Sequence, residues 1–187
     1  MKFIFDFDDV LFNNTTQFKK QIFNVLVKNG VPESVAMEYY AEVREKEFSL
    51  KKFIVFLFAK LNIKNEVDQV YKSILMGCSK FLNTELIEEV KKLGKENCYL
   101  LTNGEFEFQQ DKIKYAGILN LFDTIYIVPG TKKEIIHDIC DNNSKEKIVF
   151  VEDRVKFIKD LDFVKYPNLK AILYDEQGLE KLKAEIK

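Results

Sequence analysis

Acidic side chains follow the first apolar run of the chain at a spacing that could support chemistry. The run at residues 3–5 predicts a short strand buried on both faces, and Asp6 and Asp8 come directly after it. Residues two apart on a strand point the same way, so these two carboxylates can share one edge of a sheet. Such a pair repels unless a proton or a cation lies between its members. The pair therefore indicates a shared proton or a hard metal such as Mg²⁺, although a polar turn after a strand is the simpler alternative.

Two later apolar runs also predict buried strands that end in reactive side chains. Thr102 and Asn103 follow the first of these runs, and Glu152 and Asp153 follow the second. Parallel strands bring their carboxyl ends to one edge of a sheet, where open α/β folds bind ligands. We therefore expect all of these groups to converge, although about 150 residues separate the outer two acidic pairs.

A lysine is expected at the same edge of the sheet. Lys132 and Lys133 open a helix that follows a further predicted strand, and the amino termini of such helices face the ligand-binding edge. Carboxylates, a hydroxyl, a lysine and helix-end amides together suit one ligand especially well, a phosphoryl group with Mg²⁺.

Strands and helices that position these groups alternate along most of the chain. Strand patterns are predicted at residues 3–5, 98–101, 124–128, 148–151 and 170–173. Helical patterns are predicted at residues 16–31, 32–47, 50–61, 65–78, 84–93, 106–115, 132–140, 155–161 and 179–186. Ser49 and Asn65 are predicted helix N-caps, Thr131 to Glu134 a capping box, and Gly94 a helix end.

The order of these elements predicts an α/β fold with a Rossmann-like parallel sheet sandwiched by helices. The first strand is separated from the next by an all-helical block, which predicts an inserted helical domain. We assign residues 1–14 and 83–187 to the sheet domain and residues 15–82 to the insert.

Composition excludes several classes of protein. Hydrophobic residues make up 47% of the 187 residues, enough for a packed core. The formal net charge of −1 combines 29 basic with 30 acidic residues, which argues against nucleic-acid binding. The longest markedly apolar stretch, residues 53–59, is too short to span a membrane, and the first residues do not resemble a signal peptide. We expect a soluble, cytoplasmic protein without a membrane partner; the oligomeric state is not predicted.

Cysteine and histidine chemistry is disfavoured. Cys78, Cys98 and Cys140 show no CxxC spacing, and none has an arginine six positions later, as a cysteine-dependent phosphatase loop requires. Cys98 is expected in the core. His137, the only histidine, rules out a histidine-rich metal site and is expected at the surface or its boundary.

The four groups of residues, in this order, resemble the motifs of the haloacid dehalogenase-like (HAD) superfamily of phosphohydrolases. The segments that resemble the first and second motifs are Phe3-Ile4-Phe5-Asp6-Phe7-Asp8-Asp9-Val10-Leu11 and Leu100-Leu101-Thr102-Asn103-Gly104. Those that resemble the third and fourth motifs are Lys132, at the start of its helix, and Val149-Phe150-Val151-Glu152-Asp153. The resemblance covers the whole chain, and the helical block stands where the family carries its C1-type cap.

The resemblance implies a Mg²⁺-dependent phosphatase acting on a small phosphorylated metabolite. Asp6 would be the nucleophile that forms an aspartyl-phosphate, and Asp8 the general acid and base. Thr102 would hydrogen-bond the phosphoryl group with help from Asn103, and Lys132 would offset the anionic charge.

Mg²⁺ would be held by residues of the first and fourth motifs. The resemblance implies Asp6, the backbone carbonyl of Asp8, and Asp153 as ligands, with Glu152 close by. The helical cap would cover the site and select the substrate, with hinges near residues 13–14 and 82–83.

Two departures from the family pattern bear on these expectations. Asp9 replaces a common glycine, and Arg154 follows the fourth motif where smaller residues are usual, which predicts a tighter or more charged rim of the site.

Three further residues bear on the assignment of roles. Lys133 could replace Lys132, but the hydrophobic residues three and four positions after Lys132 favour Lys132. Asp8 argues against dehalogenase chemistry, which does not need that acid. Arg44 in the cap could grip an anionic substrate, although a surface ion pair is the simpler interpretation.

Two other functions remain open. A phosphotransferase or phosphomutase could use the same site, because the Glu152-Asp153 pair also resembles sugar-phosphate mutases. A non-catalytic, phospho-receiver-like module also uses acids, a threonine and a lysine around Mg²⁺. Such a module would carry its phosphate-accepting aspartate at the end of a later strand, where this chain has Thr102.

Overall fold

The computed structural model describes residues 1–43 and 48–186. Its centre is one parallel sheet with the strand order β3-β2-β1-β4-β5, so the first strand lies in the middle. The strands are β1 (Lys2–Phe5), β2 (Cys98–Asn103), β3 (Thr124–Val128), β4 (Ile148–Glu152) and β5 (Leu169–Leu173). The central place of β1 puts Asp6 between the ends of β2 and β4.

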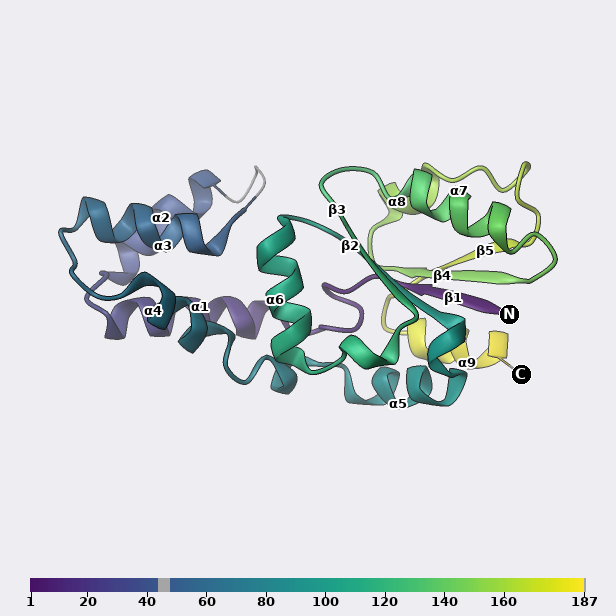
Figure 1. Cartoon of the computed structure of the whole chain (residues 1–187), viewed down its shortest axis with the longest axis horizontal. Coiled ribbons are helices and arrows are strands. Elements are labelled where there is room, and N and C mark those ends of the chain that lie inside the picture. Colours follow the sequence, from purple (N-terminus) through teal and green to yellow (C-terminus); the bar gives the residue numbers. More distant parts are fainter. Residues whose placement is uncertain (44–47, 187) are drawn as a thin grey trace.

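Helices cover both faces of the sheet (Figure 1). One face carries α7 (Lys133–Asn142) and α8 (Val155–Lys159), and the other carries α5 (Thr84–Leu93) and α9 (Gly178–Ile186). Side chains of β1 alternate between the two resulting cores: Ile4 packs with the α7 side, and Phe3 and Phe5 with the other. Both faces of the sheet are therefore buried at its centre, which explains the unbroken apolar runs of the central strands.

The helical insert forms a separate block beside the sheet domain (Figure 1). It contains α1 (Thr15–Lys28), α2 (Glu33–Val43), α3 (Leu50–Lys60), α4 (Val67–Leu75) and the 3₁₀ turn η1 (Cys78–Phe81). α6 (Phe106–Ala116) stands between the block and the sheet; two further 3₁₀ turns, η2 (Lys95–Asn97) and η3 (Leu119–Leu121), lie in the sheet domain.

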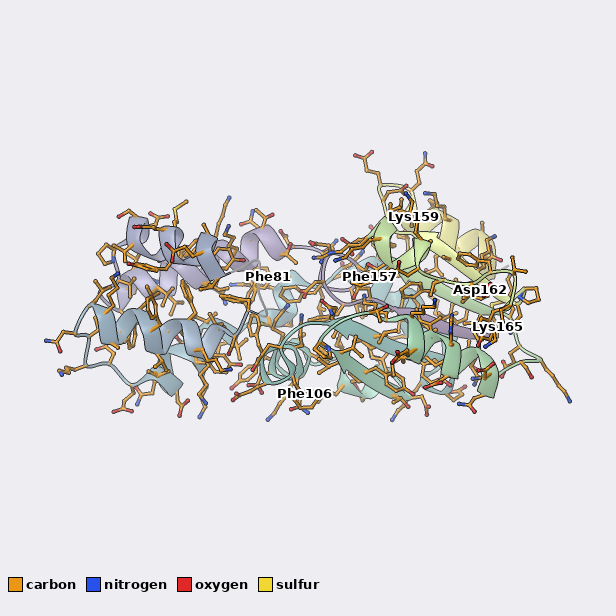
Figure 2. The ribbon with its side chains drawn as sticks, turned by 90° about the horizontal axis from the view of Figure 1, so that it is seen from above. Phe81, Phe106, Phe157, Lys159, Asp162 and Lys165 are labelled. Carbon is orange, nitrogen blue, oxygen red and sulfur yellow. The ribbon has the colours of Figure 1, made fainter. Side chains whose placement is uncertain are left out.

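Aromatic side chains join the insert to the sheet domain. Phe81 lies at this junction (Figure 2), with its ring centroid 5.6 Å from that of Phe12 and 5.5 Å from that of Phe18. The chain leaves and re-enters the sheet domain side by side, because the backbone N–H of Asn83 donates to the carbonyl of Leu11 at 2.8 Å. The domain boundaries at 14/15 and 82/83 stay a prediction.

The α/β fold class expected from the sequence is confirmed, and every predicted strand and helix has a counterpart among the described residues. Cys98 is fully buried and His137 is half-buried, as expected. Residues 44–47, which include Arg44, lie outside the described residues, so the proposal for Arg44 has no structural counterpart. No helix in the described part of the chain is long and apolar enough to cross a membrane.

Two predicted helix caps are wrong, and a third only marks the helix start. Asn65 does not cap α4, whose N-cap is Glu66; the Asn65 amide instead donates to the Asn29 side chain at 2.9 Å. The capping box does not form, because Thr131 Oγ1 accepts from the N–H of Lys133 and the N-cap is Lys132. Ser49 takes the N-cap position of α3 without a capping hydrogen bond from its side chain.

The fourth predicted helix also ends earlier than expected. α4 stops at Leu75, and the chain passes through Gly77 in the left-handed region (φ 78°) before the 3₁₀ turn begins. Glycine adopts this conformation without steric cost, which allows the chain to turn back toward the sheet.

Candidate active site

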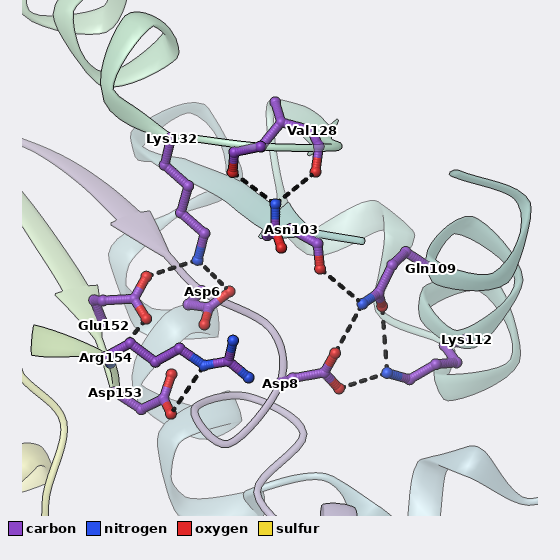
Figure 3. A network of polar contacts seen from close by, with 11 residues as sticks. Asp6, Asp8, Asn103, Gln109, Lys112, Val128, Lys132, Glu152, Asp153 and Arg154 are labelled. Carbon is purple, nitrogen blue, oxygen red and sulfur yellow. Dashed lines mark hydrogen bonds and ion pairs between the residues drawn. The ribbon is translucent and has the colours of Figure 1, made fainter. Parts of the chain in front are cut away.

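Asp6 lies directly after β1 and is 5% exposed. Its backbone N–H donates to the carbonyl of Val151 at 2.9 Å, which extends the pairing of β1 with β4 by one residue. The Lys132 ammonium lies 2.6 Å from Asp6 Oδ1 and also 2.6 Å from Glu152 Oε2 (Figure 3). One buried cation thus bridges two buried anions that come from opposite ends of the chain.

Lys132 reaches this position from the amino terminus of α7. The residue is 1% exposed, and its ammonium lies 4.8 Å from the ring centroid of Phe157, so the side chain is enclosed on its apolar side too. The neighbouring Lys133 is exposed. Between the two lysines that the sequence offers, the fold brings Lys132 to the acids.

Three carboxylates form one cluster at the end of β1 and β4. Each of Asp6, Glu152 and Asp153 offers an oxygen within 4.8 Å of the other two. Both oxygens of Glu152 accept hydrogen bonds, one from Lys132 and one from the backbone N–H of Arg154 at 3.0 Å. Asp153 Oδ1, in contrast, is buried without a hydrogen-bond partner.

Burial changes the acidity of this cluster. It raises the pKa of Asp6 well above the usual value, although the Lys132 ammonium acts in the opposite direction. Burial, reinforced by the neighbouring Glu152, raises the pKa of Asp153 to about 6. Oxygen ligands and excess negative charge are what Mg²⁺ prefers, and the unpartnered Asp153 oxygen gives a cation a place to bind. The residues present therefore fit a magnesium ion.

Asp8 is held by a second set of residues, on α6. Its Oδ1 lies 2.5 Å from the Lys112 ammonium and its Oδ2 accepts from Gln109 Nε2 at 2.8 Å (Figure 3). Lys112 is 4% exposed and its ammonium lies 5.0–5.2 Å from the ring centroids of Phe7, Phe12 and Phe108. The carboxylate of Asp8 is fixed by a buried cation in an aromatic environment.

Gln109 and Lys112 were not among the residues that the sequence predicted for the site. The sequence carried a signal, because the apolar residues at 108, 113 and 116 recur at helical spacing and Gln109 and Lys112 fall within the same stripe, all five positions of which are buried. Two polar residues on such a stripe require partners in the interior. The sequence alone does not identify those partners.

Thr102 and Asn103 end β2 beside the acids. Thr102 is 1% exposed. The Asn103 side-chain amide donates to the backbone carbonyls of Val128 and Gly130, at 3.1 and 2.6 Å, and the backbone carbonyl of Asn103 accepts from Gln109 Nε2 at 3.1 Å. Asn103 therefore ties the loop after β3 to α6; direct substrate binding by Asn103 stays a prediction.

Two positions that depart from the family pattern take up distinct places. Asp9 has a φ of 61°, in the left-handed region that favours glycine, which aspartate tolerates better than most residues. Its side chain accepts from Thr15 Oγ1 at 2.5 Å and so connects the first motif to α1. Arg154 has its Nε 3.9 Å from Asp153 Oδ2, with a half-exposed side chain.

Parallel strands that deliver acids and a lysine to one edge define an α/β protein with a charged site at the carboxyl ends of its strands. The family model of haloacid dehalogenase-like hydrolases matches residues 3–161. The chain therefore belongs to this hydrolase family. No curated protein matches the chain.

Solved structures share the fold at low sequence identity. A candidate haloacid dehalogenase-like hydrolase from Burkholderia xenovorans matches with a TM-score of 0.70 and 14% identity, over 95% of this chain and 86% of the other. A candidate β-phosphoglucomutase from Thermotoga maritima matches at 0.59 and 18%, over 98% and 99%. The candidate hydrolase YfnB from Bacillus subtilis, bound to magnesium, matches at 0.58 and 12%, over 100% and 98%. These similarities show the fold.

Proposed function

We propose that this protein is a Mg²⁺-dependent phosphatase that acts on a small phosphorylated metabolite in the cytoplasm, without nucleic-acid or membrane partners. One observation carries the proposal. The Lys132 ammonium lies 2.6 Å from both Asp6 and Glu152, beside an Asp153 oxygen that is buried and unpartnered. A bound phosphoryl group needs positive charge next to an anionic nucleophile. Lys132 supplies part of it, and a cation held by the excess of carboxylates would supply the rest.

In the first half-reaction, an Asp6 oxygen attacks phosphorus and the bond from phosphorus to the leaving oxygen breaks. Asp8 gives its proton to that oxygen, so an alcohol leaves and Asp6 carries the phosphoryl group. In the second half-reaction, Asp8 takes a proton from water as the water oxygen attacks phosphorus. The bond to Asp6 then breaks and orthophosphate leaves.

Two other residues of the site would stabilise the phosphoryl group. Lys132 would hold Asp6 in position and offset the charge of the phosphoryl oxygens, and Thr102 would donate to one of them. Asp6, Asp153 and the backbone carbonyl of Asp8 would hold the magnesium ion. Glu152, which pairs with Lys132, would lie close by. When bound, the ion supplies further positive charge for the phosphoryl oxygens.

Removal of the metal tests the proposal. Phosphate release from p-nitrophenyl phosphate should fall to background in EDTA and return when Mg²⁺ is added in excess, whereas Ca²⁺ should not restore it, because it favours more ligands at longer distances. A panel of phosphorylated metabolites, measured for phosphate release, would then identify the substrate. Full activity in EDTA would refute the metal dependence.

A phosphomutase is the second candidate, based on the Glu152-Asp153 pair at the end of β4. Both functions share the aspartyl-phosphate, and they differ in whether water or a second hydroxyl of the substrate receives the phosphoryl group. Interconversion of sugar-phosphate isomers without net phosphate release would indicate the mutase.

Lys112→Met should lower kcat about tenfold to a hundredfold and leave KM nearly unchanged, because Asp8 loses the ammonium that fixes its carboxylate. Methionine retains the stem in the aromatic surroundings, and the Asp8 side chain is 24% exposed, so the free energy of unfolding should fall by only about 1–2 kcal/mol. Steady-state kinetics and urea unfolding measure both. Lys114→Met, exposed on the same helix, is the matched control; equal kcat in the two variants would contradict the positioning of Asp8.

A further inference from the structure

A cavity of about 530 Å³ lies where the helical insert meets the sheet domain. Its described lining combines residues of α1 and α2 with residues of α6 and the strand-end loops. Asp8 is part of this lining, whereas Asp6 is not. Because Asp8 is the proposed proton donor to the leaving oxygen, this cavity is the place for the leaving group of the substrate.

Aromatic rings form a continuous wall of the cavity. The Phe18 and Phe108 rings are nearly parallel at 22°, with centroids 6.3 Å apart. Phe48 meets Phe108 edge-on at 5.8 Å, and Tyr40 meets Phe48 edge-on at 5.2 Å. Four rings from the insert and α6 thus line one small volume, and an aromatic guest could add to this chain of edge and face contacts.

Three of the hydrogen-bond donors around the cavity already have partners within the protein. The Thr15 hydroxyl donates to Asp9, and the Asn103 amide donates to the carbonyls of Val128 and Gly130. Gln109 donates to Asp8. The hydroxyl groups of a sugar would compete with these bonds for the Thr15, Asn103 and Gln109 donors, whereas an aromatic ring needs none of them.

Among the described residues that line the cavity, Lys19 is the cation without an acidic partner. Lys112 is paired with Asp8, and Arg154 lies near Asp153. The half-buried Lys19 ammonium lies 4.4 Å from the centroid of the Tyr40 ring, and no carboxylate of the described residues lies within 4.0 Å of it. A cation in this position can pair with an anionic group of the bound molecule.

We infer that the substrate is a phosphate monoester whose leaving group carries an aromatic ring with an acidic group on the side away from the phosphate. The ring lies against Phe18, Phe48 and Phe108, and the acidic group pairs with Lys19. This inference rests on the proposed phosphatase function and names the class of its substrate.

Three synthetic substrates with leaving alcohols of similar acidity test the inference. The enzyme should have about a fivefold higher kcat/KM for 2-phenylethyl phosphate than for 2-cyclohexylethyl phosphate, which has a saturated ring of similar size. A carboxyl group at the para position of the phenyl ring should raise kcat/KM about tenfold more. Each ratio compares two substrates on the same enzyme, so it does not depend on the folded fraction of a variant.

Two variants connect the ratios to the named residues. Phe48→Leu should reduce the phenyl-to-cyclohexyl ratio to about one, whereas Phe56→Leu, on the exposed side of α3, should leave it unchanged. Lys19→Met should remove the gain from the carboxyl group, whereas Lys20→Met, its exposed neighbour, should retain it.

The outcomes separate this inference from the function on which it rests. Absence of Mg²⁺-dependent phosphate release from p-nitrophenyl phosphate would reject the phosphatase itself, and with it the substrate class. Normal release from that compound, together with equal or better use of the cyclohexyl ester, would overturn the aromatic preference alone. A carboxyl gain that persists in Lys19→Met would overturn the assignment of Lys19.

Discussion

Asp6→Asn should lower kcat by at least about 10⁴-fold, because the amide cannot form the aspartyl-phosphate on which both half-reactions depend. Loss on this scale is typical when the nucleophile of a covalent mechanism is removed. The substitution keeps the size of the side chain, and its amide oxygen can still accept from Lys132. The free energy of unfolding should therefore change by no more than about 1 kcal/mol, since the variant also removes a buried charge beside Glu152.

Mass spectrometry distinguishes a missing nucleophile from a damaged fold. Wild-type protein quenched in acid during turnover should carry one added phosphoryl group on the peptide that contains Asp6, and Asp6→Asn should carry none. Asp138→Asn, on the exposed side of α7, should behave as the wild type. Asp6→Asn with more than a few per cent of wild-type kcat would assign the nucleophile elsewhere.

The strand ends show why the sequence is informative about this site. An apolar run that stops at an acid indicates both a buried strand and the edge at which it ends, so the meeting of Asp6 with Asp153 follows from parallel topology alone. The choice of Lys132 over Lys133 also follows, because a helix that packs on a sheet has one buried side. These predictions depend on the periodic spacing of apolar residues in strands and helices, which can be read directly from the sequence.

Side-chain partners between distant elements could not be predicted in the same way. Asp8 meets Lys112 because α6 lies beside the loop that follows β1, and nothing in the spacing of residues about a hundred apart specifies that arrangement. The predicted caps failed for a related reason. Asn65 finds a partner in Asn29, the C-cap of α1, and this tertiary contact competes with the local hydrogen bond that the pattern suggested.

Lys132→Met should destabilise the fold by about 3–5 kcal/mol at pH 8 without Mg²⁺, because Asp6 and Glu152 would then be buried together without a countercharge. The loss should depend on pH in a defined direction. Burial raises the pKa of Asp6, and the variant removes the lysine that opposes this, so the folded state binds a proton that the unfolded state releases near pH 4. The free energy of unfolding should therefore decrease as the pH rises above about 4.

Mg²⁺ should compensate for the missing ammonium, which makes the prediction specific to charge. Saturating Mg²⁺ should raise the Tm of Lys132→Met by more than it raises the Tm of the wild type, because the ion then supplies the countercharge as well as its binding energy. Thermal unfolding at pH 5 and pH 8, each with and without Mg²⁺, gives the Tm of each variant under these four conditions. Lys133→Met, exposed at the next position, should match the wild type throughout. A Lys132→Met variant as stable as Lys133→Met at pH 8 without Mg²⁺ would show that the acids tolerate burial without the lysine.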